Sequence, residues 1–209
     1  MRILTMEQGS PEWYQARLGI PTASCFDKIL TPTGKSSTQA SAYANTLLAE
    51  WLCGQPLEDF NNGWMERGKK LEKSARAYYQ MIADADVTQV GLVLRDDGKA
   101  GCSPDGLVGD VGMLQIKVPA PHTHVGYLLK SEAPTGYYSQ LQGEMYIAER
   151  EWNDFLSFHP LMPPVLVRVE RDEKHIAKLI REIDALLEVI ESRKAELIAK
   201  NITPLEKAA

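Results

Sequence analysis

Apolar and polar residues alternate most clearly between Leu114 and Val118, where every second residue is apolar. Successive side chains of a strand point to opposite faces, so this period predicts a strand over 113–118 with Leu114, Ile116 and Val118 toward a core. Gln115 and Lys117 would then share the other face. Comparable apolar runs bounded by turn residues predict further strands at 87–94, 99–103, 155–158 and 165–169.

Helical periodicity, with apolar residues three or four positions apart, accounts for most of the remaining chain. Ser10 and Pro11 are typical of a helix start, and Thr22 is placed to cap a helix over 23–30. Longer helices are expected at 40–53, 64–82 and 135–149, and from residue 172 onward. The inward residues expected in the two middle helices are Leu71, Ala75, Tyr78 and Ile82, then Tyr138, Leu141, Met145 and Ala148. This order of elements predicts an α/β fold with a mixed central sheet flanked by helices.

Composition limits the class of protein further. The 209 residues are 44% hydrophobic and no linker or repeat divides them, so we expect one domain over residues 1–209. No leader peptide or membrane-spanning run is visible, and three unpaired-looking cysteines suit a reducing cytoplasm as small buried residues. The net charge of -5 argues against a broad basic surface that coats nucleic acid. A nucleic-acid enzyme of this composition should confine its positive field to a cleft or channel.

Candidate chemistry centres on Asp105 and on the Gln115-Ile116-Lys117 run. A carboxylate, a second carboxylate ten residues later and a lysine two positions beyond it form the frame of a two-metal phosphodiesterase. Gln115 stands at the second carboxylate position, so one anionic ligand is replaced by its neutral isostere. A hairpin would bring Asp105 beside Gln115. Taken alone, the same residues also fit an ordinary Asp-Gly turn followed by a strand with an exposed lysine.

Phosphodiester hydrolysis requires cations that neutralise charge on the phosphate and make a water nucleophilic. Mg²⁺ or Mn²⁺ prefers oxygen ligands, which Asp105, residue 115 and the Ile116 carbonyl could provide. Lys117 could hold the attacking water or help remove its proton. A second metal candidate, the pair His122 and His124, has too few ligands and fits a solvated loop better.

Several motifs in order along the chain resemble the phage lambda exonuclease family, also called YqaJ-like viral recombinases, which is built on a restriction-endonuclease-like core. The matching segments are Trp13 with Arg17-Leu18-Gly19 and Thr22-Ala23-Ser24, Leu47 to Glu50, Arg67-Gly68-Lys69 with Glu72, Cys102 to Leu107, Lys117 with Pro119, Gln140 with Gln142, and Val169 to Lys174. Agreement of several motifs is more specific than any one of them. Gln115 departs from the family pattern, which has Glu there.

The resemblance implies a role for each matched residue. Glu72 and Asp105 become metal ligands, residue 115 lies between two Mg²⁺ or Mn²⁺ ions, and Lys117 lies beside the attacking water. The pocket for a terminal 5′-phosphate is implied to contain Arg17, Ser24 and Ser103, and an arginine fork with hydroxyl donors suits a phosphate dianion. Gln140 is implied to position substrate or water. The further DNA-binding candidates are Thr22 and Lys35, the latter on a loop over 31–39.

The activity implied by the resemblance is a 5′-to-3′ exonuclease on double-stranded DNA ends. It works as a ring-shaped homotrimer in the cytoplasm of a phage-bearing host and leaves a 3′ overhang for a single-strand annealing protein. Because Gln115 lacks the bridging charge, we expect this copy to be impaired. Two alternatives stay open: a DNA-end-binding module that no longer cuts, and a structural α/β protein with a coincidental motif.

Overall fold

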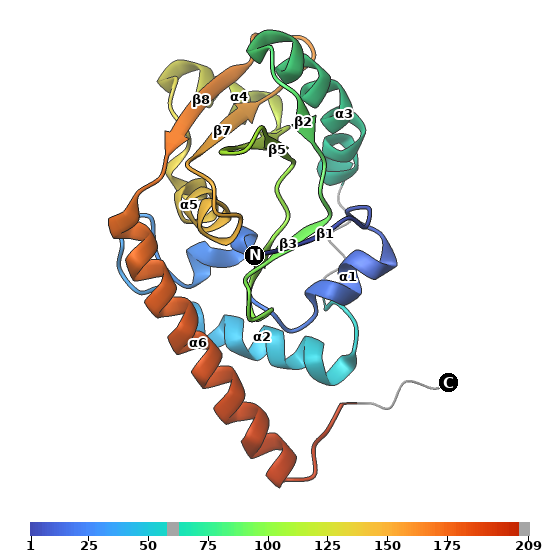
Figure 1. Cartoon of the computed structure of the whole chain (residues 1–209), viewed down its shortest axis with the longest axis vertical. Coiled ribbons are helices and arrows are strands. Elements are labelled where there is room, and N and C mark those ends of the chain that lie inside the picture. The colour runs from blue at the N-terminus through green and yellow to red at the C-terminus, as the bar shows by residue number, and fades with distance from the viewer. Residues whose placement is uncertain (58–62, 205–209) are drawn as a thin grey trace.

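The computed structural model describes residues 1–57 and 63–204, without the side chains of 63–67 and 69. Arg67 and Lys69 of the matched motif therefore lie outside the described side chains. Two sheets form the strand framework (Figure 1). A three-stranded sheet has the order β1 (Arg2–Leu4), β3 (Leu92–Leu94), β4 (Gly101–Cys102). A five-stranded sheet has the order β2 (Val87–Thr88), β5 (Gly106–Val108), β6 (Gly112–Lys117), β7 (Trp152–Ser157), β8 (Val165–Glu170).

The larger sheet is mixed, because β6 and β7 pair in parallel while its other neighbouring strands are antiparallel. The helices that pack around the two sheets are α1 (Pro11–Arg17), η1 (Ala23–Lys28), α2 (Ala40–Cys53), α3 (Gly63–Ala83), α4 (Pro121–Lys130), η2 (Thr135–Tyr137), α5 (Tyr138–Ile147) and α6 (Glu173–Ala199). This arrangement confirms the predicted α/β class with a mixed sheet flanked by helices. In the described part of the chain, none of the helices is both long and apolar enough to cross a membrane.

The central strand β6 is buried on both faces. Leu114 and Ile116 pack with Ala75 and Tyr79 of α3 and with Leu156, which confirms the predicted apolar face. Gln115 lies on the other face and is itself 4% exposed, so this face is buried as well. Paired residues of neighbouring strands share a face, so Asn153, Phe155 and Ser157 of β7 join Gln115 and Lys117 there.

Several predicted elements differ from the structure. The expected strand at 87–94 is divided between two sheets as β2 and β3, whereas β1, β5 and α4 were not predicted. Thr22 occupies the N-cap position of η1 as predicted, but its hydroxyl bonds Arg17 and Ser24 and makes no capping bond, and the helix is a 3-10 helix that ends at Lys28.

Individual burial predictions also need correction. In α3 the fully buried aromatic residue is Tyr79, not the neighbouring Tyr78, and Ile82 is exposed. The helix therefore turns a slightly different face to the sheet than the apolar stripe indicated. In α5, Leu141, Met145 and Ala148 are buried as expected. Cys53 is exposed, although the composition had suggested three buried cysteines.

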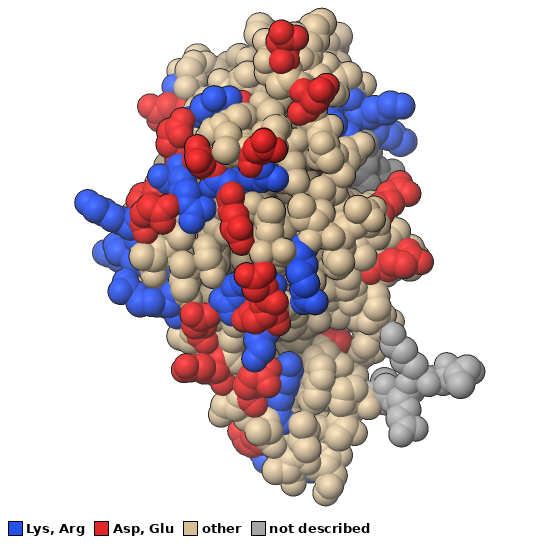
Figure 2. Space-filling model, in the orientation of Figure 1, with Lys and Arg blue, Asp and Glu red and all other residues tan. Residues whose placement is uncertain are grey.

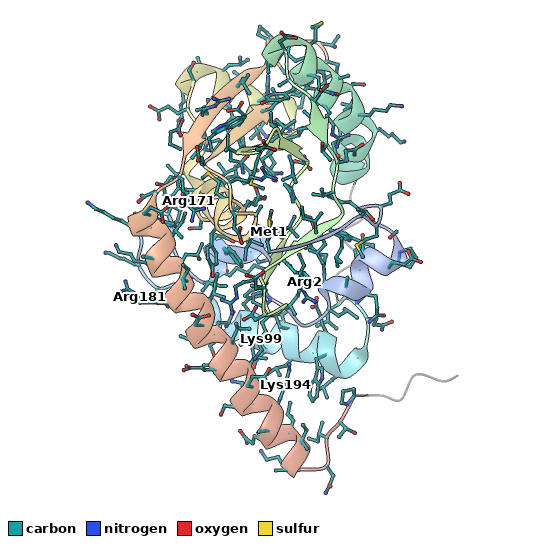
Figure 3. All side chains as sticks on the ribbon, viewed as in Figure 1. Met1, Arg2, Lys99, Arg171, Arg181 and Lys194 are labelled. Atoms are coloured by element: carbon teal, nitrogen blue, oxygen red, sulfur yellow. The ribbon has the colours of Figure 1, made fainter. Side chains whose placement is uncertain are left out.

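Acidic and basic side chains are interspersed over the face drawn in Figure 2. Figure 3 places the labelled Arg181 and Lys194 along α6, so basic residues of this face are spread along a helix. This distribution agrees with the expectation from the net charge that no broad basic surface coats the molecule on this side.

Gly143 of α5 tests the packing between this helix and η1. A Cβ at Gly143 would lie 2.2 Å from the Phe26 ring, which is fully buried and has no room to move. Gly143→Ala should therefore destabilise the protein by about 1–3 kcal/mol through overpacking. Gly126→Ala in α4 is the matched control, since its Cβ would meet open space and alanine favours a helix by about 1 kcal/mol. Urea denaturation should rank the control at or above the parent, and equal midpoints for both variants would contradict the packing.

Candidate active site

Asp105 lies next to Gln115, as the sequence predicted. The residue directly precedes β5, and the β5–β6 hairpin pairs Gly106 with Leu114, which returns the chain alongside it. The Oδ2 atom of Asp105 accepts hydrogen bonds from the Ile116 amide and from Gln115 Nε2, both at 2.6 Å. The strand that makes this hairpin is β5, not the predicted strand at 99–103, whose ordered part belongs to the other sheet as β4.

The side-chain amide oxygen of Gln115 is a buried acceptor without a hydrogen-bond donor among the described residues. Nε2 is committed to Asp105, and Oε1 accepts no hydrogen bond from any residue that the structure describes. Leaving such an atom unpaired costs about 1–3 kcal/mol, so a donor or cation at this point would be stabilising. An oxygen atom next to a carboxylate suits a hard divalent cation.

Glu72 on α3 is linked to Asp105 through Arg76. The carboxylate of Glu72 pairs with the Arg76 guanidinium one helical turn later, and Arg76 Nε donates to the Asp105 carbonyl at 3.1 Å. Arg76 is buried, and its role was not predicted because the Glu72–Arg76 spacing is equally common on solvated helix faces. The Arg76 guanidinium therefore lies between the Glu72 carboxylate and the backbone carbonyl of Asp105.

Lys117 extends the cluster toward η2, which directly precedes α5. Its Nζ atom lies 4.9 Å from the centre of the Tyr137 ring. Burial raises the pKa of Asp105 to about 7; Lys117 and Arg76 oppose that shift and Glu72 adds to it. Asp105, Glu72 and Lys117 are thus close enough to interact electrostatically.

Two side chains of α5 complete this side of the cluster. Gln140 Nε2 donates to Glu144 Oε1 at 2.7 Å, and Asn153 Nδ2 donates to Glu144 Oε2 at 2.9 Å. Burial raises the pKa of Glu144 to about 7, against the effects of Gln140 and Lys117, while Asp105 raises it further. Gln140 was predicted from the sequence and Glu144 was not, because nothing local distinguishes a buried glutamate from a solvated one.

The oxygen donors suit Mg²⁺ or Mn²⁺ in kind, although not in charge. They are the carboxylates of Asp105 and Glu72, the unpaired amide oxygen of Gln115 and the Ile116 carbonyl. Among the described residues, no three His, Cys, Asp or Glu side chains gather as a metal site would require. Gln115 accounts for part of this shortage, since it replaces a carboxylate with an amide.

Arg17 forms a second polar group, built from three separated segments. Its guanidinium stacks on the Trp13 ring at 4.1 Å and donates to the hydroxyls of Ser103 at 3.1 Å and Thr22 at 3.2 Å. Ser24 Oγ lies 3.3 Å from Thr22 Oγ1. These neighbours are neutral, so they orient the guanidinium without cancelling its charge, and burial lowers the pKa of Arg17. An incoming anion would relieve that cost.

The structure also places Lys35 and the pair His122 and His124. Lys35 is exposed on the loop after η1, where the neighbouring Ser36 donates to Glu182 of α6. The histidine pair lies on helix α4 and not on a loop: His122 is exposed, whereas His124 is fully buried and bonds Ser157 Oγ and the Pro163 carbonyl. His124 is therefore a core residue that ties α4 to the end of β7.

Comparison with known proteins agrees with this fold. An alkaline exonuclease from Laribacter hongkongensis, LHK-Exo, is 34% identical with a TM-score of 0.84, over 92% of this chain and 98% of that one. Its complex with dAMP gives the same values. A phage related exonuclease from Haemophilus somnus 129PT shares the fold at 16% identity and a TM-score of 0.69, over 85% of this chain and 96% of that one.

The architecture is therefore that of these exonucleases. A family model for the YqaJ-like viral recombinase domain matches residues 12–151, which is more than half of the chain. The chain belongs to the YqaJ-like viral recombinase domain family. An uncharacterized protein of Acanthamoeba polyphaga mimivirus is 25% identical over 169 residues, which are 74% of this chain and 30% of that protein. The chain thus spans about a third of the length of this viral relative.

Proposed function

We propose that the protein is a Mg²⁺- or Mn²⁺-dependent exonuclease that degrades one strand of duplex DNA from its 5′ end. The observation that carries this proposal is the cluster of Asp105, Glu72, Gln115 and Lys117 together with the polar group around Arg17. Ser103, which holds Arg17, is two residues from Asp105. The likeness to LHK-Exo, an alkaline exonuclease crystallised with the nucleotide dAMP, supports the substrate class.

In this proposal each residue has a chemical task. When bound, the divalent ions would stabilise negative charge on the phosphate and lower the pKa of water. Asp105, Glu72, Gln115 Oε1 and the Ile116 carbonyl would hold them. Lys117 would orient the attacking water, and Gln140 would accept a hydrogen bond from water or substrate. Arg17, with Ser103, Thr22 and Ser24, would bind the terminal 5′-phosphate, and Lys35 would contact DNA outside this centre.

A second candidate is a DNA-end-binding protein that no longer cuts. The amide at position 115 favours it, because a neutral ligand would hold divalent ions more weakly than a carboxylate. Both candidates use the same end-binding pocket and differ in turnover alone. We also propose that the protein works in the cytoplasm of a phage- or prophage-bearing bacterium. Digestion of the 5′ strand would leave DNA with a 3′ overhang, to which a single-strand annealing protein would bind.

Gln115→Glu should raise the rate of nucleotide release from a 5′-phosphorylated duplex with saturating Mg²⁺ by about a hundredfold or more. The reason is that a full negative charge returns to the side chains that would hold the metal ions, an effect comparable to restoring one transition-state-stabilising group. On that background, Asp105→Ala or Lys117→Ala should abolish release. Gln55→Glu makes the same change at an exposed position and should have no effect. A parent that already turns over as fast as Gln115→Glu would remove residue 115 from the bridging position.

Arg17→Ala should remove the preference for a 5′-phosphorylated end over a 5′-hydroxyl end. Loss of a charge-assisted fork to phosphate costs about 1.5–3 kcal/mol, roughly a 10- to 150-fold change in affinity. Binding of both blunt duplexes, measured by anisotropy, gives the ratio for the parent and the variant. Arg181→Ala, an exposed arginine on α6, is the control and should keep the preference. Equal affinity for both ends in the parent would eliminate the pocket.

A homotrimer that encloses the duplex is the assembly implied by the resemblance. It would explain how a chain with a net charge of -5 retains DNA, since a basic channel can lie inside an acidic ring. Multi-angle light scattering at working concentration should give three times the 23.3 kDa chain mass. The mass of one chain would rule out the ring and the processivity it provides.

A further inference from the structure

Glu144 is a fully buried carboxylate to which the proposed chemistry assigns no task. It is 1% exposed, and both of its oxygens accept hydrogen bonds from side-chain amides. Burying a carboxylate without an ionic partner is costly, and Asp154, the other buried carboxylate nearby, is paired with Arg168. Lys117 and Asp105 act on this carboxylate with opposite signs, since Lys117 lowers the pKa of Glu144 and Asp105 raises it.

The placement of α5 explains this interaction. Gln140 and Glu144 are four residues apart and lie one turn apart on the same side of α5, and Tyr137 ends η2 directly before that helix. Tyr137 contacts Lys117, and Glu144 contacts Asn153 further along the chain. Lys117 and Asn153 share a face of the sheet. Gln140 therefore lies over the polar face of β6 and β7, between the two contacts.

We propose that Glu144 is a positioning residue of this centre: it fixes the Gln140 amide and supplies toward Lys117 the negative charge that Gln115 lacks. An ionised carboxylate accepts hydrogen bonds but donates none. Glu144 therefore holds the NH₂ group of Gln140 and leaves the amide oxygen as the atom available to the centre. This inference rests on the proposed nuclease function for its kinetic part.

The variant Glu144→Gln tests both roles with little change in shape. One amide oxygen then faces two donors, Gln140 and Asn153, so the orientation of Gln140 is no longer fixed. At pH 9, where Glu144 is ionised in the parent, kcat should fall about 10- to 100-fold, as when a supporting partner of a metal ligand is lost. KM and DNA affinity should stay within about twofold of the parent. On the Gln115→Glu background the loss should be smaller, because the introduced carboxylate then supplies charge beside Lys117.

Asp154→Asn is the matched control. Asp154 is a buried carboxylate on the same strand as Asn153, but it points to the opposite face and bonds Arg168 and Tyr79. This variant can lose stability and should keep its kcat. An unchanged kcat in Glu144→Gln, an equal loss in Asp154→Asn, or the same fold-loss with Gln and Glu at position 115 would each overturn the proposal.

A readout independent of cleavage separates this inference from the proposed function. The side-chain amide resonances of Gln140, recorded by ¹H–¹⁵N NMR, should shift in Glu144→Gln and stay in place in Asp154→Asn. If no variant, including Gln115→Glu, releases nucleotides, the nuclease proposal fails while the amide resonances still report on Glu144. Unmoved Gln140 resonances in Glu144→Gln would overturn the positioning role whether or not the protein cuts DNA.

Discussion

Burial of a polar strand face in the middle of the molecule is the constraint from which the site follows. Strand β6 has α3 against its apolar face, and Gln115 on the other face is buried as well. Helix α5 packs against the neighbouring strand β7, where Glu144 bonds Asn153. Buried polar groups require partners. The Asp105 carboxylate accepts a hydrogen bond from the Gln115 side-chain amide, and the Glu144 carboxylate accepts one from Asn153 of the neighbouring strand. The result is a layer of hydrogen-bonded polar side chains within an apolar core.

The sequence was informative where the periodicity is local. Alternation over 113–118 predicted the faces of β6, and the helix at 40–53 has the predicted bounds. It was uninformative where distant segments decide the outcome. Three residues of β5 pair with β6 and so become a strand, and His124 is buried because Ser157 and the Pro163 carbonyl meet it from elsewhere. Neither effect leaves a pattern in neighbouring residues.

The candidate site shows the same division. Asp105, Gln115 and Lys117 were found from spacing, and the family resemblance added Glu72 and Gln140. Arg76 and Glu144 were missed, because an arginine or a glutamate on a helix is most often solvated. Their burial depends on the packing of α3 and α5 against the sheet. Charges that tune a site are thus harder to predict than the residues carrying the main motif.

The boundary between the two sheets has a geometric consequence. Ser103 follows β4 of the small sheet and bonds Arg17, whereas Asp105 precedes β5 of the large sheet. Two residues of chain span at most roughly 7 Å. The residue that holds Arg17 and the residue that begins the Asp105 cluster are thus tied to different sheets by one short link. A shift of one sheet relative to the other would therefore change the spacing between the two polar groups.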